Sequence, residues 1–372
     1  MLMKQIFHIV AGNLFGGVES FLVTLAKSKA LERDIIHRFA ICFPGRLCRE
    51  IADAGAPVEM IGPARIMGIS STKKAKKILD AALLKHSPEV IVCHMSWAQI
   101  IFGGVATKHG KWVAHHHGPS TNSWMDWIAV KRSPDLVISP SMDSSSTWFK
   151  KYRRNVNTLN YPVRQVFVDA SKNISKANAR SRFSLPQNKI LIVQCSRIEP
   201  WKGHDVLLEA LARINSNENW HMLFAGAPQK RADQVYFGNL QEQCKKLGLS
   251  SRVSWLGDVE EVHTLMLACD IYCQANRGPE GFSLAFLEAS FCGLPIVTTR
   301  LGGASEIVEG NGFLVSEPSP ALFAEKLNLL INDSNLRNKQ SEAAFNIGNR
   351  MGYPSNQVVK YENLCLGEGS GK

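Results

Sequence analysis

The sequence predicts an α/β protein with two Rossmann-like domains, each built on a parallel sheet, that face each other across a cleft. Three observations lead to this prediction. The 372 residues exceed what one hydrophobic core usually supports. Apolar strand-like segments alternate with amphipathic helix-like segments, which is the pattern of parallel sheets covered on both faces. A polar segment near the middle separates two such series.

The first series of strands predicts an N-terminal domain over residues 1–165. Its predicted strands are Gln5–Val10, Ile36–Cys42, Val90–Cys93, Trp112–His115 and Leu136–Ser139. The stretch that follows is polar and has no clear periodicity, so we expect residues 166–186 to form a linker.

The second series predicts another domain over residues 187–352. Its predicted strands are Ile190–Cys195, His221–Ala225, Val253–Leu256, Ile271–Cys273 and Ile296–Thr299. Residues 353–372 are expected to form a C-terminal helix, which could pack back on the first domain, and a flexible tail. Because ligands bind beyond the carboxyl ends of parallel strands, the loops after Cys195, Cys273 and Thr299 should share one rim.

Composition favours a cytoplasmic protein. The longest mostly apolar run, residues 91–106, is too short to cross a bilayer, and the N-terminus has no signal-peptide pattern. Nine cysteines without a Cys-x-x-Cys pair indicate neither a disulfide framework nor a zinc site. Cys269 and Cys273 lie four apart on an apolar stretch, which is typical of buried thiols rather than metal ligands.

The positive charge lies in the first half of the chain. Residues 1–165 contain 22 Lys and Arg against 11 Asp and Glu, whereas residues 166–372 contain 21 of each. One segment, STKKAKKILDAALLKHS, combines four lysines with an apolar stripe, Ile78, Leu79, Ala82 and Leu83. Such a helix could rest on an anionic membrane, or it could be a solvated helix with its stripe in the core. A phosphorylated acceptor would explain the same charge, and no nucleic-acid-binding module is present.

Two carboxylates flank a predicted helix start. Glu280 closes a loop, and Glu288 lies eight residues later in the helix that follows. A diphosphate could bind the backbone amides around this start, at Gly281, Phe282, Ser283 and Leu284. Glu280 would then meet the group attached to the phosphate, and Glu288 could accept hydrogen bonds from ribose hydroxyls. The alternative is a surface helix with two solvated glutamates.

Two further rim loops contain residues suited to a diphosphate. Arg197 and Lys202 lie on the turn after the first strand of the second domain, where two cations could stabilise a leaving diphosphate. They could also be ordinary exposed turn residues. Gly302 and Gly303 would let the backbone of the third loop approach a ligand closely.

Together these three loops resemble the nucleotide-sugar-binding half of the family-4 retaining glycosyltransferases, which have the GT-B fold. The match covers residues 190–316 and follows the family order: Arg, Lys-Gly, Glu-Gly-Phe with a second Glu, then Gly-Gly-x-x-Glu. The resemblance implies that Arg197 and Lys202 bind the donor diphosphate, that Glu280 sits at the transferred sugar and that Glu288 sits at the ribose. It also implies that the base rests against residues 256–259, including Gly257.

The first half resembles the family more loosely. The loop AGNLFGGVES is similar to the family's glycine loop, in which Gly16 and Gly17 would approach donor phosphate and acceptor. It has neither the dinucleotide-binding glycine pattern nor a P-loop, which disfavours oxidoreductases and NTPases. In VAHHHGPS the resemblance favours His117 as the sugar-contacting histidine, with His115 and His116 left open. The family's Asn-x-Val-Asp junction is absent, which puts a junction contact to the acceptor in doubt.

The expected activity is transfer of a hexose-type sugar, with retention, from a nucleoside diphosphate to a glycan or lipid-linked acceptor in bacterial surface polysaccharide or glycolipid synthesis. A UDP-sugar is favoured and GDP-mannose comes next. Glu280, His117, Arg197 and Lys202 are the expected catalytic residues, and no metal or other cofactor is expected because cations and amides neutralise the leaving group. Alternatives are a nucleotide-sugar epimerase of the same fold and a catalytically silent sugar-nucleotide-binding protein. The expected location is cytoplasmic, or peripheral at the inner face of the membrane.

Overall fold

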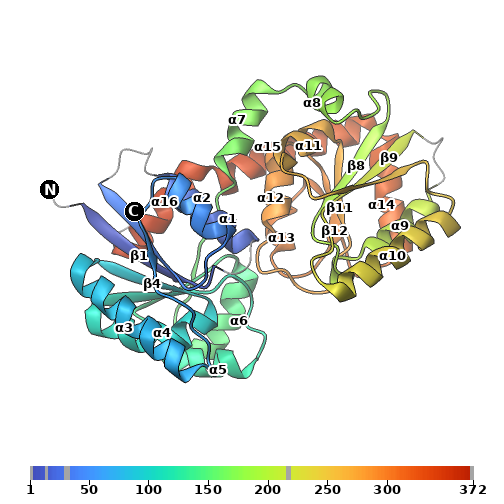
Figure 1. Cartoon of the computed structure of the whole chain (residues 1–372). Helices are drawn as coiled ribbons and strands as arrows, with labels where there is room; N and C mark the ends of the chain where they lie inside the picture. The colour runs from blue at the N-terminus through green and yellow to red at the C-terminus, as the bar shows by residue number, and fades with distance from the viewer. Residues whose placement is uncertain (1–2, 13–15, 29–33, 215–218, 369–372) are drawn as a thin grey trace. The chain divides into compact units, whose positions relative to one another are not determined.

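A computed structural model describes residues 3–12, 16–28, 34–214 and 219–368, and divides the chain into two compact units (Figure 1). The first unit comprises residues 1–164 together with 354–372, and the second comprises residues 165–353. Each unit is a Rossmann-like α/β domain built on a parallel sheet, as predicted.

The first unit has a seven-stranded sheet in the order β3-β2-β1-β4-β5-β6-β7, in which neighbouring strands are parallel. Its strands are β1 (Lys4–Val10), β2 (Ile35–Ile41), β3 (Val58–Met60), β4 (Val90–His94), β5 (Lys111–His115), β6 (Leu136–Ser139) and β7 (Asn157–Thr158). The five predicted strands are all present. The two strands that were not predicted, β3 and β7, have three and two residues, too few to show an apolar alternation.

Helices cover both faces of this sheet (Figure 1). They are α1 (Gly17–Lys27), α2 (Arg46–Asp53), α3 (Ile69–His86), α4 (Met95–His109), α5 (Trp124–Val130), α6 (Met142–Tyr152) and α16 (Pro354–Leu366). Phe7 and Ile9 of β1 join the hydrophobic core beneath α3 and α4. Because side chains alternate along a strand, His8 points to the other face, which α1 and α16 cover.

The C-terminal helix α16 belongs to the first unit, as the sequence suggested. Lys111 Nζ donates a hydrogen bond of 2.8 Å to the carbonyl oxygen of Cys365, and His37 bonds to Glu362 at 3.0 Å. The chain therefore leaves the first unit, forms the second and returns. Its last helix packs on one face of the first sheet.

The second unit has a six-stranded parallel sheet in the order β10-β9-β8-β11-β12-β13. Its strands are β8 (Ile190–Cys195), β9 (Trp220–Ala225), β10 (Val253–Gly257), β11 (Ile271–Gln274), β12 (Ile296–Thr299) and β13 (Gly312–Val315). The glycine-rich β13 was not predicted. Cys269 and Cys273 are buried free thiols, as expected.

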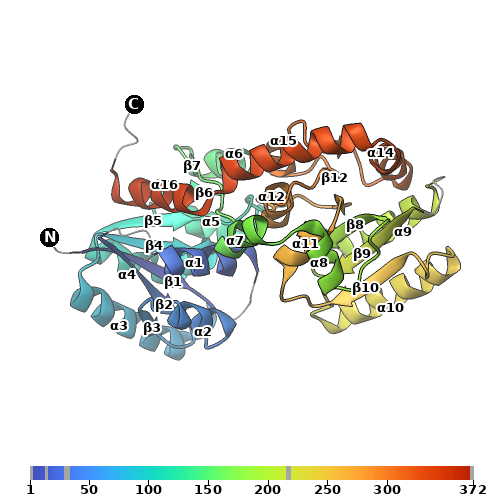
Figure 2. The same cartoon turned by 90° about the horizontal axis from the view of Figure 1, so that it is seen from above.

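The helices of the second unit after its first strand are α9 (His204–Ala212), α10 (Arg231–Lys246), α11 (Val262–Ala268), α12 (Leu284–Phe291), α13 (Ala304–Ile307), α14 (Pro320–Asn332) and α15 (Ser334–Gly352), with a short 3-10 helix at Pro200–Lys202. Figure 2 shows α14 and α15 along one side of this sheet. At Gly348 in α15, a Cβ atom would lie 2.4 Å from the backbone nitrogen of Phe291. The two backbones are thus in contact, and this contact sets the position of α12.

The predicted linker was wrong. Residues 166–186 contain most of α7 (Gln165–Asn173) and all of α8 (Lys176–Arg182), and they belong to the second unit. Buried Arg180 donates to the carbonyl oxygen of Ala268 at 3.0 Å and to the carboxylate of Asp270 at 2.6 Å. Two short helices joined by a turn show no continuous period, so the segment resembled coil.

The structure also decides between two interpretations of the lysine-rich helix α3. Leu79, Ala82 and Leu83 pack in the core of the first unit, and only Ile78 of the stripe is exposed, at 37%. The stripe is therefore not available to enter a membrane, and the lysines remain on the outside. In the part of the chain that the structure describes, no helix is long and apolar enough to span a bilayer.

Candidate donor site and histidine cluster

The three predicted rim loops of the second unit meet through glycines. Gly203 has φ +69°, and a Cβ atom there would lie 1.8 Å from the carbonyl oxygen of Ala275. Gly302 has φ +59°, and a Cβ atom there would lie 2.1 Å from the carbonyl oxygen of Glu280. The amide of Gly303 donates to that same oxygen at 3.0 Å. Only glycine permits both the left-handed backbone and these approaches, so the loops form one continuous surface.

The centre of this surface is an ion pair between Lys202 and Glu280. Lys202 Nζ contacts Glu280 Oε1 and lies 3.9 Å from the centre of the Trp201 ring, and the two charged side chains are only 10% and 14% exposed. Burial raises the pKa of Glu280, but the charge of Lys202 and hydrogen bonds from Lys202, Ser283 and Asn276 outweigh it, so the pKa lies below its usual value. Glu280 is therefore ionised at neutral pH.

Glu199 orients the second predicted cation. Arg197 Nη1 lies 3.1 Å from Glu199 Oε1, and Trp201 Nε1 donates to Glu199 Oε2 at 2.8 Å. The side chain of Arg197 is 45% exposed, whereas that of Glu199 is buried. The contact with buried Glu199 thus fixes the position of the Arg197 guanidinium, which remains accessible to solvent. We did not predict Glu199, although an acidic residue between two cations was a usable signal.

A second set of contacts, which the sequence did not predict, joins the loop after β11 to the segment after β8 that leads into α9. Arg277 forms a bidentate pair with Asp205, with N–O distances of 2.7 and 2.5 Å, and the Tyr236 hydroxyl donates to the same carboxylate at 2.8 Å. The backbone amide of Arg277 donates to the carbonyl oxygen of Trp201 at 2.8 Å. Arg277 and Asp205 are 72 residues apart, so spacing alone could not reveal their contact.

Helix α12 begins where the diphosphate site was predicted. Ser283 is its N-cap residue and Leu284 its first helical residue, so Gly281 and Phe282 lie in the loop that leads into it. Glu288 follows one turn later and is 6% exposed. Glu280 and Glu288 are both largely buried, so the alternative of two solvated glutamates was wrong.

Gly257 ends β10 on the same edge of the sheet. It has φ +65°, and its carbonyl oxygen accepts a 2.7 Å hydrogen bond from the amide of Gly226. At Gly226 a Cβ atom would lie 2.0 Å from the carbonyl oxygen of Ser196, which precedes Arg197. The predicted base-binding loop and the predicted diphosphate-binding loop are therefore neighbours.

The predicted glycine loop of the first unit is described in part. Gly16 is the N-cap residue of α1 and Gly17 its first helical residue, and both are exposed. Residues 13–15 of the loop lie outside the described residues. A Cβ atom at Gly17 would meet nothing within 4 Å, so packing within the unit does not require glycine there. Approach to a ligand by these two glycines stays a prediction.

Four histidines project from one face of the first sheet. His8, His37, His94 and His115 lie on β1, β2, β4 and β5, and in the register His94 stands opposite His115. The residues just before three of them, Phe7, Cys93 and Ala114, face the other side and pack in the core there. From the sequence we predicted a role only within the triplet His115 to His117, although alternation within the strands was a signal for the other histidines.

Three of these histidines, His37, His8 and His94, form a hydrogen-bonded chain across the sheet that continues to His117. The links, in order, are Glu362 Oε1 to His37 Nε2 at 3.0 Å, His37 Nδ1 to His8 Nε2 at 2.9 Å, His8 Nδ1 to His94 Nε2 at 3.0 Å, His94 Nδ1 to His117 Nε2 at 2.8 Å, and His117 Nδ1 to the Tyr161 hydroxyl. One assignment satisfies every link: each imidazole donates through Nε2 and accepts at Nδ1.

Burial keeps His8, His94, His115 and His117 neutral. It lowers the pKa of His94 to about 3, and it lowers the pKa values of His8, His115 and His117 well below the usual value, with neighbouring histidines adding to the effect. A positive charge on any of these rings would lack solvation, so all four are neutral imidazoles at pH 7.

The structure separates the three histidines of the triplet. His116 stacks on Trp148 at 3.4 Å between ring centres and bonds to the Tyr152 hydroxyl at 3.0 Å, as an interior residue would. His115 is fully buried. His117 is the partly exposed one, but both of its ring nitrogens already bond, to His94 and Tyr161.

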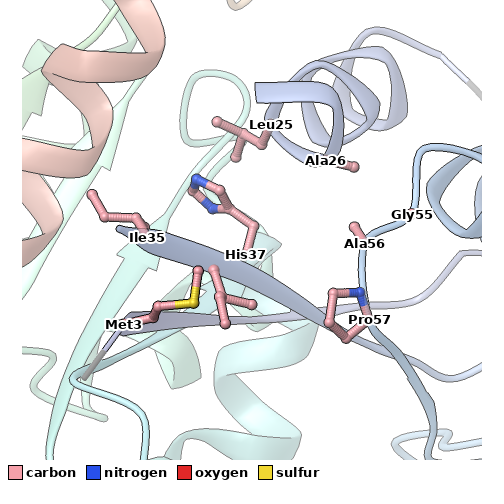
Figure 3. A pocket seen from close by; sticks show the side chains of 9 residues that line it. Met3, Leu25, Ala26, Ile35, His37, Gly55, Ala56 and Pro57 are labelled. Carbon is pink, nitrogen blue, oxygen red and sulfur yellow. The ribbon is translucent and has the colours of Figure 1, made fainter. Parts of the chain in front are cut away.

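A cavity of about 190 Å³ lies in the first unit at the opposite edge of the sheet (Figure 3). Its lining comes from residues that precede or begin β1, β2 and β3, among them Met3, Ile35 and Pro57, and from His37. Ligands of parallel sheets bind beyond the carboxyl ends of the strands, so this mainly apolar cavity is not a donor site.

Comparison with known proteins agrees with the geometry of the second unit. Residues 175–347 match the family model described as glycosyl transferases group 1. This match lies within the second unit and covers just under half of the chain. Among its relatives is the D-inositol 3-phosphate glycosyltransferase of Corynebacterium efficiens, which is 31% identical over 179 residues, 45% of this chain and 41% of the relative. The match thus spans about two fifths of the length of this curated relative.

Solved structures resemble the whole chain. The complex of Anabaena HepE with UDP has a TM-score of 0.83 and 23% identity, and covers 97% of this chain and 99% of HepE. The complex of HepE with UDP-glucose has a TM-score of 0.79 and 22% identity, over 96% and 99%. WaaG, a glycosyltransferase involved in lipopolysaccharide biosynthesis, has a TM-score of 0.70 and 16% identity, over 97% and 100%. At these identities the likeness establishes the fold alone, which is the GT-B fold that the sequence predicts.

Proposed function

We propose that this protein is a retaining glycosyltransferase that moves a hexose-type sugar from a UDP-sugar to a glycan or lipid-linked acceptor. The observation that carries the proposal is the contact between Lys202 and Glu280 just before α12, with Arg197 on the same loop as Lys202, within the stretch that matches the group 1 family model. Two cations and a helix start provide the positive potential that a leaving diphosphate requires.

Each donor-site residue has a role in this proposal. Arg197 and Lys202 bind the diphosphate, together with the amides at Gly281 to Leu284, and Glu280 lies at the transferred sugar. Since Lys202 already contacts Glu280, one ammonium can touch both the phosphate and the carboxylate that faces the sugar. Glu288 accepts from the ribose, and Gly257 lines the base. No metal is required, because these groups neutralise the departing charge.

The first unit holds the acceptor in this proposal. Gly16 and Gly17 approach the donor phosphate and the acceptor, and His117 contacts the sugar. A UDP-sugar is favoured over GDP-mannose because HepE was solved with UDP and with UDP-glucose. A role in surface polysaccharide or glycolipid synthesis is supported by the likeness to WaaG. The proposed place of action is the cytoplasm or the inner face of the membrane.

Calorimetric titration of the purified protein with UDP, GDP, ADP and CMP tests the donor site. We expect UDP to bind, and Arg197→Ala to weaken binding by roughly 10- to 100-fold, since a hydrogen bond to a charged group contributes about 1.5–3 kcal/mol. Arg213→Ala, which removes an exposed arginine just after α9, is the control and should bind UDP normally.

The other outcomes separate the alternatives. Failure to bind any of the four nucleotides would contradict the donor site itself. Binding of UDP with release of an epimerised free donor, and with no acceptor present, would favour an epimerase. Binding without turnover for any acceptor would favour a silent sugar-nucleotide-binding protein.

We further propose that the basic first unit contacts an anionic membrane through the lysines of α3. Lys73 and Lys77 lie one turn apart and are both exposed. Replacing both with Gln should weaken binding to phosphatidylglycerol vesicles by roughly 30-fold, because each lysine at such a surface contributes about 1 kcal/mol. Co-sedimentation measures this, and Lys245→Gln with Lys246→Gln on α10 is the matched control. Equal binding by both double variants would contradict the membrane role and leave a phosphorylated acceptor as the partner.

A further inference from the structure

Three histidine nitrogens converge at the carboxyl edge of the first sheet. His94 ends β4, His115 ends β5, and His117 follows two residues later. One ring nitrogen from each lies within 4.8 Å of the others, and His94 Nδ1 is 2.8 Å from His117 Nε2. Three imidazoles that meet in this way have the composition of a transition-metal site.

His115 supplies an independent observation. Its side chain is fully buried, and neither ring nitrogen has a hydrogen-bond partner among the residues described. Aromatic rings surround it, with Phe21 edge-on at 5.3 Å and Tyr361 at 5.6 Å between ring centres. A buried polar group without a partner costs about 1–3 kcal/mol, so interior polar atoms are nearly always satisfied. A cation that accepts a lone pair from His115 would remove this cost.

We propose that His94, His115 and His117 bind one Zn²⁺ ion. Zn–N bonds of about 2.0–2.1 Å place the nitrogens of a tetrahedral site roughly 3.4 Å apart. The His94–His117 pair must therefore open slightly and His115 must close in, movements well within the reach of side-chain rotation. Three neutral histidines leave a fourth position for water or for a ligand oxygen, as in other three-histidine zinc sites.

The histidine chain provides the outer hydrogen bonds that such a site needs. If Nδ1 of His94 binds the ion, its Nε2–H still donates to His8, and the chain continues through His37 to the carboxylate of Glu362. If Nε2 of His117 binds the ion, its Nδ1–H can donate to the Tyr161 oxygen. Hydrogen bonds from the far nitrogens of metal-bound histidines orient the rings, and a carboxylate in the chain helps to balance the charge.

The proposed zinc site lies in the first unit, and none of its ligands belongs to the donor loops of the second. It therefore does not depend on the glycosyltransferase activity proposed above. The two proposals compete for one atom, Nε2 of His117, because this nitrogen cannot bind zinc and contact a sugar at the same time. Zinc occupancy and sugar contact by that nitrogen exclude each other.

Direct metal binding tests the inference. The full chain without an affinity tag is treated with EDTA, desalted and titrated with Zn²⁺ against a chromophoric chelator. We expect one Zn²⁺ per chain. His115→Phe should lose more affinity than the roughly 10- to 100-fold that removal of an outer partner costs, and His8→Phe should show that outer-partner loss. His109→Gln is the control. It removes a histidine at the end of α4 that pairs with the exposed Asp80, and it should bind Zn²⁺ like the wild type.

His115→Phe is suited to this test because phenyl fills the same space and removes two unsatisfied nitrogens, so its melting temperature in EDTA should not fall. Absence of Zn²⁺ binding, or unchanged affinity in His115→Phe, would overturn the proposal. Should that variant fail to fold, Co²⁺ absorption of the wild type decides the matter. Intense ligand-field bands without a thiolate charge-transfer band support three histidines, whereas a pale octahedral spectrum or a thiolate band refutes them.

Discussion

Replacing Lys202 with Met should lower kcat for sugar transfer by at least about 100-fold, the loss seen when a preorganised donor to a developing anion is removed. Lys202 is held between the Trp201 ring and Glu280 and loses little conformational freedom when a phosphate arrives. The same substitution should destabilise the second unit by about 3–5 kcal/mol, because it leaves a buried carboxylate without its counter-charge. Without the Lys202 charge, burial should also raise the pKa of Glu280.

A double variant separates the two effects. Adding Glu280→Gln to Lys202→Met removes the buried charge, so urea unfolding should show most of the stability restored while transfer stays lost. Lys246→Met, on the exposed end of α10, controls for loss of a lysine in the same unit. Near-normal turnover in Lys202→Met would argue strongly against the proposed diphosphate site.

Replacing Gly203 with Ala should abolish measurable UDP binding while Gly248→Ala leaves it intact. The two glycines have the same backbone conformation, with φ +69° and +68°. A Cβ atom at Gly248 would meet nothing within 4 Å, whereas at Gly203 it would lie 1.8 Å from the carbonyl oxygen of Ala275. Gly248→Ala therefore measures only the free-energy cost of placing a Cβ atom in the left-handed conformation, which is about 1–2 kcal/mol.

Gly203→Ala adds a collision between two backbones, which can be relieved only if the Lys202 loop moves away from the end of β11. Such a shift separates Lys202 from Glu280 and removes the hydrogen bond between Arg277 and the Trp201 carbonyl. Calorimetry with UDP and urea unfolding of both variants measure the difference. Equal affinity for UDP in the two variants would show that the contact between the loops does not shape the site.

Local pattern was sufficient for most strands and for the donor loops. Apolar runs between polar turns predicted ten strands, and the charged residues that follow β8 and β11 predicted Arg197, Lys202 and Glu280 as neighbours. These signals are contained in a few consecutive residues and need only the rule that parallel strands share an edge. The contact of Arg277 with Asp205 joins a loop to the first turn of α9, and the hydrogen bond from Arg180 to Ala268 joins α8 to α11, so neither has a local signal.

The sequence by itself determined which face of each strand a histidine occupies, because side chains alternate along a strand. It could not show that His37, His8, His94 and His115 are neighbours, since that depends on the strand order β2-β1-β4-β5. The order results from burying helices on both faces of one sheet, a property of the whole unit. The tertiary structure therefore decided that histidines up to 109 positions apart, from His8 to His117, form one hydrogen-bonded cluster.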